Sequence, residues 1–308
     1  MLKRKQLGTP DELVGAYDST CARTGATIAC WGSPRDGVLA MQVDYPTFHV
    51  VAPPPGQQWT RLLGGNRALC GRTSNGGLAC WGRLPNAPTF SPMQQNDIDL
   101  QSVTNLRFGD DFACGPRLDG GRTCWGDNNL AQLGDGATGA TVTSPMPVYN
   151  AVVTSLAAYN DHACALTSIG GIVCWGANYQ SSDGRPDSEP YEILPVDVAS
   201  STGPLASCSE VDVTTNFACA ICGGSAWCWG GNYQYQLGRG FTSSRYPDGD
   251  AVQVNLPAGT YAHLAVGYDH ACAVSDGGLL YCWGYGVNGQ IGDGSHGACY
   301  PTPLARAR

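Results

Sequence analysis

The chain has 308 residues and a formal charge of −8, from 25 acidic and 17 basic side chains. Glycine contributes 42 residues and charged residues only 14%, so the composition departs from that of a typical soluble domain. No Gly-X-Y period runs through the sequence, which excludes a collagen-like chain, and the glycine and proline content excludes a coiled coil. Disorder is not expected, because the chain combines 43% hydrophobic residues with low charge and many aromatic and β-branched residues. The acidic balance argues against nucleic acid as a partner, because a phosphate backbone needs a cationic surface. No apolar run approaches the roughly 20 residues that span a bilayer.

Six similar segments recur along the chain, at residues 21–32, 70–82, 114–126, 164–176, 219–230 and 272–284. Each begins with a cysteine and has a second cysteine nine or ten residues later, which is followed by Trp-Gly. Successive second cysteines are about 50 residues apart, a period typical of solenoids, propellers and arrays. Six such periods use the whole chain, so we expect a single domain over residues 1–308.

The residues between the two cysteines predict a β-hairpin in each segment. Four pairs need a three-residue loop, whose last position favours glycine in the left-handed region. Glycine occupies that position in all four: Gly76, Gly120, Gly170 and Gly278. The two shorter pairs need a two-residue loop that suits glycine, and they contain Gly25-Ala26 and Gly223-Gly224. The two cysteines of every hairpin are therefore expected to face each other.

Facing cysteines on antiparallel strands can be joined with little strain, so we expect one cross-strand disulfide in each repeat. The expected pairs are Cys21–Cys30, Cys70–Cys80, Cys114–Cys124, Cys164–Cys174, Cys219–Cys228 and Cys272–Cys282. Reduced pairs packed as small hydrophobic groups are the alternative. Zinc is a weaker alternative, because two cysteines per hairpin do not make four ligands. No metal site and no cofactor are expected.

Three cysteines fall outside the repeats. Cys222 lies beside the Gly-Gly turn and faces away from Cys219, and Cys208 is the nearest unpaired candidate for it, so a Cys208–Cys222 staple is expected. Cys299 is then left over. An odd cysteine in an exported protein is either a free thiol or an intermolecular bond.

Two further strands flank each hairpin. The preceding segments, at 13–17, 62–65, 106–109, 156–159, 211–214 and 264–267, are mostly small and apolar, which suits inner strands packed around an axis. The following segments often carry proline, as at 145–148 and 301–304, which confines them to edge strands or loops. Four short antiparallel strands repeated every 50 residues or so describe the blade of a β-propeller. The sequence therefore predicts an all-β propeller of four-stranded antiparallel blades.

The repeat at residues 266–294 resembles that of the regulator of chromosome condensation family. It has a histidine before a small apolar strand, a glycine turn, Trp-Gly, and then Asn-Gly-Gln-Ile-Gly. Similar copies lie at 124–136, 161–178 and 228–238. The resemblance covers nearly all of the chain and implies a β-propeller. The paired cysteines look more like those of the bacterial secreted branch and of plant receptor ectodomains than like nuclear members.

The number of blades departs from the family pattern, since the family usually closes seven and six repeats are counted here. Residues Gln6-Leu7-Gly8 look like the tail of a preceding repeat. The N-terminus therefore either completes the last blade or marks a truncation, and closure with six or with seven blades stays open.

The loops after Trp-Gly collect aromatic and amide residues: Asn178, Tyr179, Asn232, Tyr233, Tyr235 and Tyr285. Tyrosine with amide side chains makes a good protein-contact rim at low entropic cost. A β-lactamase inhibitor of the resembled family binds its target through an aromatic loop face. Scattered surface tyrosine is the alternative.

Catalysis is not expected. His162 and His270 occupy the recurring histidine position of the resembled family, where a buried, hydrogen-bonded role is expected. No nucleophile, base and carboxylate occur at a recognisable spacing.

The function expected is that of an extracellular or cell-surface protein–protein interaction module. One alternative is a structural subunit of an extracellular assembly or fibre that self-associates, for example through Cys299. Another is guanine-nucleotide exchange on a small GTPase, or another intracellular regulatory role, which predicts reduced cysteines. Residues 1–6 have a basic start with no apolar stretch behind it, so the leader of an exported protein is expected to be absent from this chain.

Overall fold

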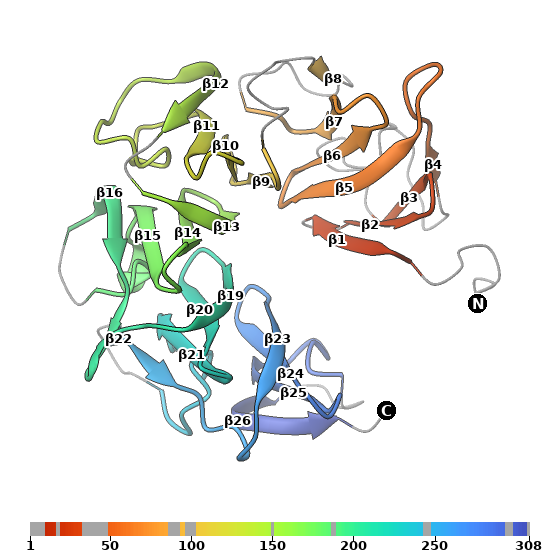
Figure 1. The fold of residues 1–308 in the computed structure, drawn as a ribbon. Coiled ribbons are helices and arrows are strands. Elements are labelled where there is room, and N and C mark those ends of the chain that lie inside the picture. Colours follow the sequence, from red (N-terminus) through yellow and green to blue (C-terminus); the bar gives the residue numbers. More distant parts are fainter. Residues whose placement is uncertain are drawn as a thin grey trace. The chain divides into compact units, whose positions relative to one another are not determined.

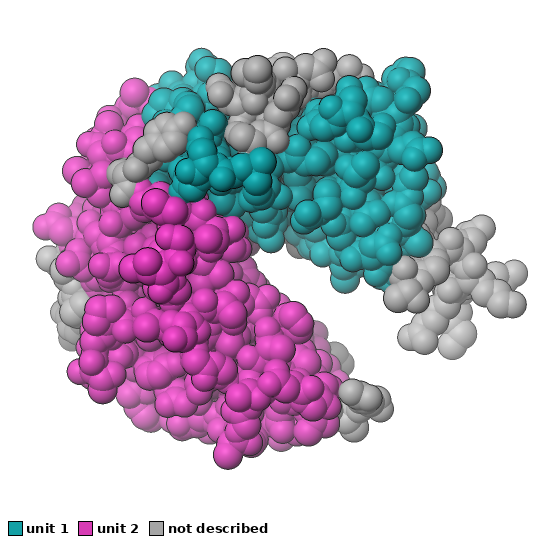
Figure 2. Space-filling model, in the orientation of Figure 1, with its two compact units in different colours: residues 1–127, 141–148 teal, residues 128–140, 149–308 magenta. Residues whose placement is uncertain are grey.

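The computed structural model describes residues 10–16, 19–32, 49–85, 93–95, 103–148, 151–185, 189–242, 248–292 and 298–306. Their strands form six antiparallel blades of four strands, one for each sequence repeat (Figure 1). The fold is a β-propeller, as predicted. The chain divides into two compact units, coloured separately in Figure 2. Unit 1 comprises residues 1–127 and 141–148, and unit 2 comprises residues 128–140 and 149–308.

Unit 1 contains the sheets of blades one to three. Blade one consists of β1 (Glu12–Ala16), β2 (Ser19–Thr24), β3 (Thr27–Gly32) and β4 (His49–Val51). Blade two consists of β5 (Trp59–Gly65), β6 (Ala68–Thr73), β7 (Leu78–Gly82) and β8 (Met93–Gln95). Blade three consists of β9 (Arg107–Phe108), β10 (Phe112–Pro116), β11 (Arg122–Gly126) and β12 (Val142–Val148).

Unit 2 contains blades four to six. Blade four consists of β13 (Val153–Tyr159), β14 (His162–Thr167), β15 (Ile172–Ala177) and β16 (Tyr191–Asp197), with a 3-10 turn, η2 (Tyr179–Ser181), between the last two. Blade five consists of β19 (Cys208–Val213), β20 (Phe217–Cys222), β21 (Ser225–Gly230) and β22 (Asp248–Gln253). Blade six consists of β23 (Tyr261–Val266), β24 (His270–Ser275), β25 (Leu280–Tyr285) and β26 (Cys299–Arg306).

Blade five carries an addition that the repeat pattern does not predict. A hairpin of β17 (Ala199–Ser200) and β18 (Gly203–Pro204) joins the outer edge of β22, so that this sheet has six strands. The contact is a single parallel pair, Ser200 opposite Ala251. This hairpin comes from the connection between blades four and five.

The hairpin registers agree with the sequence prediction. The second and third strands of each blade place the two repeat cysteines directly opposite each other: Cys21–Cys30, Cys70–Cys80, Cys114–Cys124, Cys164–Cys174, Cys219–Cys228 and Cys272–Cys282. Each of these pairs is a disulfide. Cys208 and Cys222 form a seventh, across β19 and β20.

The glycine after each Cys-Trp has a structural cause. Gly176 has a φ of +91°, and a Cβ there would lie 2.5 Å from the Asp161 carbonyl oxygen and 2.9 Å from the His162 Cα. The same close approach occurs at the matching positions of blades two, three, five and six: Gly82, Gly126, Gly230 and Gly284. Only glycine combines this backbone conformation with such a short distance to the neighbouring strand.

The cores lie between consecutive blades, and each pairs a tryptophan with the disulfide of the blade before it. Trp81 shares a buried cluster with Cys21 and Cys30, and Trp125 shares one with Cys70 and Cys80. In unit 2 the same relation joins Trp229 to Cys164 and Cys174, and Trp283 to Cys219 and Cys228. The recurrent Cys-Trp dipeptide therefore supplies one core component to each of two neighbouring interfaces.

The first strands of consecutive blades contact each other within each unit. In unit 2, for example, β19 contacts β23. Acidic side chains join them, because Glu210 and Asp212 accept hydrogen bonds from the amides of Leu264 and Val266 at 2.8 and 3.0 Å.

The segment Gln6-Leu7-Gly8 lies outside the described residues. Within the described residues, no helix combines the length and the apolar character needed to cross a bilayer.

Candidate partner-binding face

The loop after each Trp-Gly is held by the same internal hydrogen bonds wherever the repeat motif is complete. In blade five the Asn232 Oδ1 accepts from the Leu237 amide at 3.1 Å, and its Nδ2 donates to the Phe241 carbonyl at 2.8 Å. The Gln236 Oε1 accepts from the Gln234 amide at 2.7 Å. The asparagine and glutamine of the motif thus fix the loop from the inside.

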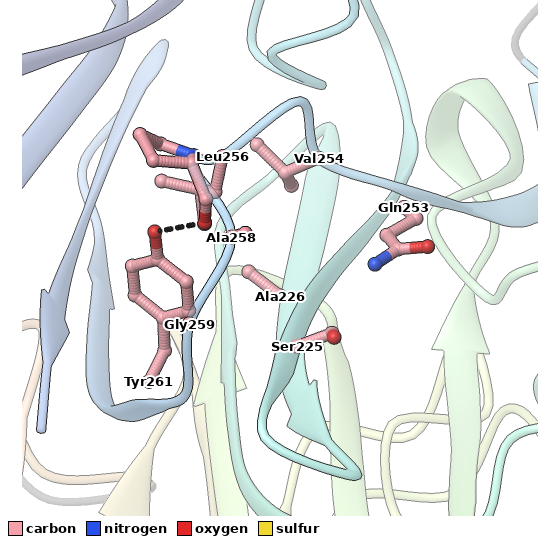
Figure 3. A pocket seen from close by; sticks show the side chains of 9 residues that line it. Ser225, Ala226, Gln253, Val254, Leu256, Ala258, Gly259 and Tyr261 are labelled. Atoms are coloured by element: carbon pink, nitrogen blue, oxygen red, sulfur yellow. Dashed lines mark hydrogen bonds between the residues drawn. The ribbon is translucent and has the colours of Figure 1, made fainter.

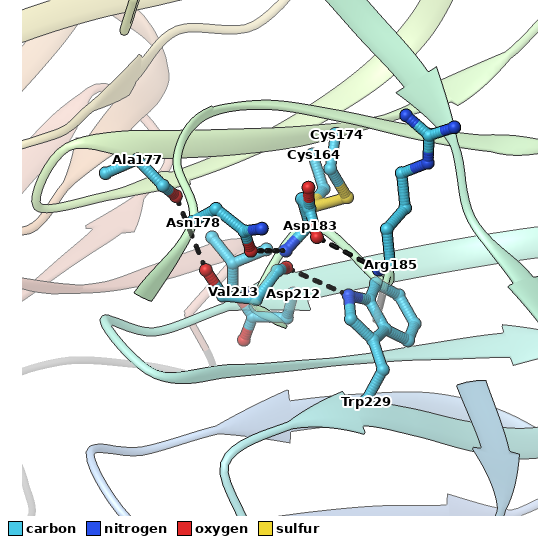
Figure 4. Close-up of a disulfide and its surroundings, with 10 residues drawn as sticks. Cys164, Cys174, Ala177, Asn178, Asp183, Arg185, Asp212, Val213 and Trp229 are labelled. Atoms are coloured by element: carbon cyan, nitrogen blue, oxygen red, sulfur yellow. Dashed lines mark hydrogen bonds between the residues drawn. A yellow bond between two sulfur atoms is a disulfide. The ribbon is translucent and has the colours of Figure 1, made fainter. Parts of the chain in front are cut away.

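The blade-four loop reaches the same geometry with a different sequence. Asn178 Oδ1 accepts from the Asp183 amide at 3.3 Å (Figure 4). Ser182 occupies the place of the glutamine, because its carbonyl accepts the indole of the next blade. The sequence matches the motif only as far as Asn178, because Ser-Asp-Gly at residues 182–184 stands where the motif has Gln-Leu-Gly.

A left-handed residue precedes the glutamine position in every copy. These residues are Ala131, Ser181, Tyr235 and Gly289, with φ of 60°, 56°, 64° and 83°. Glycine adopts this conformation freely, whereas a bulky residue such as tyrosine is an outlier there. Tyr235 is therefore held in a strained backbone conformation at the tip of its loop.

The loops also bind the next blade through its tryptophan. The indole Nε1 of Trp175, Trp229 and Trp283 donates to the carbonyl of Gln132, Ser182 and Gln236, at 2.8, 3.0 and 2.7 Å. Figure 4 shows Trp229 meeting the blade-four loop beside Asp183. The loops are consequently rigid supports for whatever they expose.

These loops and the turns between the first and second strands lie at one end of the blades. The Asp161 carbonyl accepts from the Ala177 amide at 2.9 Å, and the Asp269 carbonyl accepts from the Tyr285 amide at 2.8 Å. We call this end of unit 2, formed by residues 159–161, 177–185, 215–216, 231–242, 268–269 and 285–292, the tyrosine face.

Tyrosines are exposed on this face while the motif asparagine is not. Tyr179 and Tyr233 are 41% and 49% exposed, and Tyr268, which the sequence reading did not single out, is 62% exposed. Tyr235 and Tyr285 are partly buried. Asn232 is only 1% exposed, so its side chain orders the loop and is removed from the surface. Asn178 is partly buried, and its Nδ2 donates to the Glu189 carbonyl at 3.2 Å.

Carboxylates lie among the tyrosines. The Gln132 Nε2 donates to Asp161 Oδ1 at 3.3 Å, and the Gln236 Nε2 donates to Asp269 Oδ1 at 2.9 Å, so each aspartate is oriented by the preceding loop. Burial and the nearby Asp161 charge raise the pKa of the Tyr179 phenol, which keeps this group neutral and able to donate.

The two histidines of the repeat are buried or half-buried below this face. Burial lowers the pKa of His162 to about 4, and neither of its ring nitrogens has a hydrogen-bond partner among the described residues. Burial also lowers the pKa of His270, and Asp269 opposes that shift. The expected burial of His162 is therefore confirmed, whereas the expected hydrogen bond is not formed with any described residue.

Cys299 is partly exposed and is a free thiol, whose Sγ donates to the Gln234 Oε1 at 3.3 Å. This contact places it beside the blade-five loop of the tyrosine face.

Two hollows are lined by described residues of unit 2. A hollow of about 230 Å³ lies behind Tyr261, whose hydroxyl donates to the Pro257 carbonyl at 2.8 Å (Figure 3). An open groove of about 420 Å³ is lined by Trp227, Arg239 and Phe241. Among the described residues, no three histidine, cysteine or acidic side chains converge to hold a metal ion.

Comparison with family models matches three stretches of the chain. One model of the regulator of chromosome condensation (RCC1) repeat matches residues 153–181 and 261–290. A second model of the same repeat matches residues 223–274. The human E3 ubiquitin-protein ligase HERC2 is 32% identical over 87 residues, which are 28% of this chain and 2% of that protein. The chain therefore spans only a small part of this curated relative.

Solved structures are similar over almost the whole chain. Human WBSCR16 superposes with a TM-score of 0.80 at 19% identity, over 98% of this chain and 83% of its own. Prp20p from Saccharomyces cerevisiae superposes with a TM-score of 0.80 at 18% identity, over 96% of this chain and 76% of Prp20p. That structure is described together with the binding of Prp20p to Gsp1p and histones. These likenesses establish the fold.

Proposed function

We propose that this protein binds a protein partner on the tyrosine face. The chain is an RCC1-like β-propeller with a disulfide in every blade. The observation that carries the proposal is the exposure of Tyr179, Tyr233 and Tyr268 on internally hydrogen-bonded loops. Rigid aromatic side chains lose little entropy on binding and are enriched at protein interfaces.

The strain at Tyr235 supports the same assignment. Fold stability alone favours glycine at this left-handed position, and the other three copies have small residues there: Ala131, Ser181 and Gly289. Strained residues persist where the surrounding structure and the function require them. A tyrosine held there at a cost to stability supports a contact role for the loop tip.

The compartment that we propose is an oxidising one, outside the cell or at its surface. Fourteen of the fifteen cysteines are paired in seven disulfides, and such frameworks are rare in reducing compartments. The binding of Gsp1p and histones by Prp20p supports protein partners for this fold, whereas the disulfides favour a different setting from nucleotide exchange. Binding, with no catalytic step of its own, is the role that we assign.

The proposal is tested by affinity capture with three versions of the protein, using extracellular and intracellular fractions of the producing organism. The test variant is the double substitution Tyr179→Ser with Tyr233→Ser. The control is Ile169→Ser, because Ile169 is 91% exposed on the hairpin turn at the opposite end of blade four. The wild type and the control should retain a common protein that the double variant loses by about tenfold or more.

Retention of that protein by the double variant would refute the tyrosine face as its site. The compartment is tested separately by a peptide map under non-reducing conditions after alkylation of free thiols. Alkylation of all fifteen cysteines would contradict an oxidising compartment and would favour the nucleotide-exchange alternative, which acceleration of GDP release from a small GTPase would then establish.

A further inference from the structure

The charge of the protein is unevenly divided between its two units. Unit 1 has twelve basic and eleven acidic residues, a formal charge of +1, whereas unit 2 has five basic and fourteen acidic residues, a formal charge of −9. In the described part of unit 2, three arginines stand against twelve carboxylates. The net charge of the molecule therefore belongs almost wholly to the unit that carries the tyrosine face.

Part of this negative charge is used inside the fold. Glu210 and Asp212 bind backbone amides of the next strand, and Asp183 is buried in its loop. Asp161 and Asp269 differ from these, because they lie in the turns of the tyrosine face and are only partly buried. Their orientation by Gln132 and Gln236 holds them in place before any partner arrives.

Tyrosine rings and carboxylates on one face recognise the same chemical group. An arginine or lysine is attracted to the face of an aromatic ring and forms charge-assisted hydrogen bonds with a carboxylate. Tyr179 lies near enough to Asp161 for the two groups to interact electrostatically, and Tyr268 immediately precedes Asp269. Each aspartate is thus accompanied by an exposed ring.

We propose that the partner presents a basic protein segment, rich in arginine or lysine, to the tyrosine face, where it contacts Asp161, Asp269 and the exposed rings of Tyr179, Tyr233 and Tyr268. This inference rests on the proposed function and adds the chemistry of the partner. Two other occupants fit less well, because unit 2 is strongly negative. It would repel a nucleic acid, and it would also repel the same face of a second copy of the chain. Complementary charge would also accelerate association at low salt.

The test uses the full chain and two labelled heptapeptides, acetylated and amidated, with three arginines or three glutamates separated by glycines. Fluorescence anisotropy should detect binding of the arginine peptide only. Raising the salt from about 50 to 300 mM should weaken it by roughly tenfold, since the Debye length falls below the reach of exposed charges.

The location is tested by single charge-neutralising substitutions. Asp269→Asn should weaken binding at least threefold more than the controls Asp276→Asn, on the hairpin turn at the opposite end of the same blade, and Asp250→Asn, on the outer strand of blade five. Hydrogen exchange of the complex should show protection at residues 178–181, 232–236 and 268–269. Equal weakening by all three substitutions, or binding of both peptides, would overturn the proposal.

The two proposals fail in distinguishable ways. Suppose that the double tyrosine variant loses the captured protein, whereas Asp269→Asn and salt have no effect on its capture. The face then binds a partner, and the basic segment is refuted. If none of these changes affects capture, the tyrosine face itself is refuted.

Discussion

A buried histidine sets an acid limit on the stability of blade four. Neither ring nitrogen of His162 has a partner among the described residues, and burial lowers its pKa to about 4. Free histidine has a pKa near 6.5. Between these values the unfolded chain binds a proton that the folded chain excludes, so folding stability falls as the pH falls.

We therefore predict that the free energy of unfolding decreases by about 3 kcal/mol between pH 6.5 and pH 4 through His162 alone. Urea titrations of the protein with its disulfides intact would measure this loss. His162→Leu should give a shallower dependence, whereas Ile169→Ser should keep that of the wild type, because Ile169 is highly exposed and does not titrate. Identical pH profiles for both variants would contradict the assignment.

At the scale of the element, each hairpin combines a turn with a covalent link across it. The cysteines are nine or ten residues apart, and their sulfurs lie in the cluster that holds the next tryptophan. A cross-link of this kind acts mainly on the unfolded chain, by reducing its conformational freedom. It therefore contributes to stability even though the hairpin would have the same register without it.

Removing one of these disulfides should lower the free energy of unfolding, whereas removing the unpaired Cys299 thiol should not. The double substitution Cys164→Ala with Cys174→Ala is expected to lower the free energy of unfolding by about 2–4 kcal/mol. Cys299→Ala serves as the control, because Cys299 is partly exposed and unpaired, and it should leave the unfolding midpoint unchanged. Equal midpoints for the double variant and the control would show that the disulfide contributes nothing to stability.

At the scale of the whole molecule, the boundary between the compact units does not follow the boundary between blades. The loop at residues 128–140 follows β11 of blade three, yet it packs with unit 2. Its Gln132 carbonyl accepts the Trp175 indole, and its Gln132 side chain reaches Asp161. Blade four is thus completed by residues 128–140, which belong to the preceding sequence repeat.

We predict that a fragment of residues 128–308 is more stable than one of residues 149–308. The shorter fragment leaves the buried indole of Trp175 without its acceptor, which costs about 1–3 kcal/mol. Urea unfolding followed by tryptophan fluorescence should show a higher midpoint for the longer fragment. Coincident midpoints would mean that the loop does not stabilise unit 2.

Much of the fold could be predicted because its signals are local. The spacing of cysteines and the glycines of the turns predict the hairpin register, and both act within a dozen residues. The β17–β18 hairpin could not be predicted, since it attaches through one parallel pair with a strand about 50 residues away. The site was predicted only in part. The loops carry exposed tyrosines as expected, but the spacing of residues in the sequence does not show that the Asn232 side chain is buried. It also does not show that Ser182 takes the glutamine position in blade four.

The indole bonds give the molecule a direction of assembly. Trp175, Trp229 and Trp283 each donate to a carbonyl 43 or 47 residues earlier in the chain. Trp229 and Trp283 also pack with the disulfide cluster of the preceding blade. A chain synthesised from its N-terminus therefore always exposes the acceptor before the donor. A blade of some 50 residues emerges in roughly 3–10 s, whereas disulfide formation takes seconds to hours. Each new blade would then dock on a predecessor whose sulfurs are still being oxidised, so the supply of oxidant, more than the chain's own folding, would set the pace of maturation.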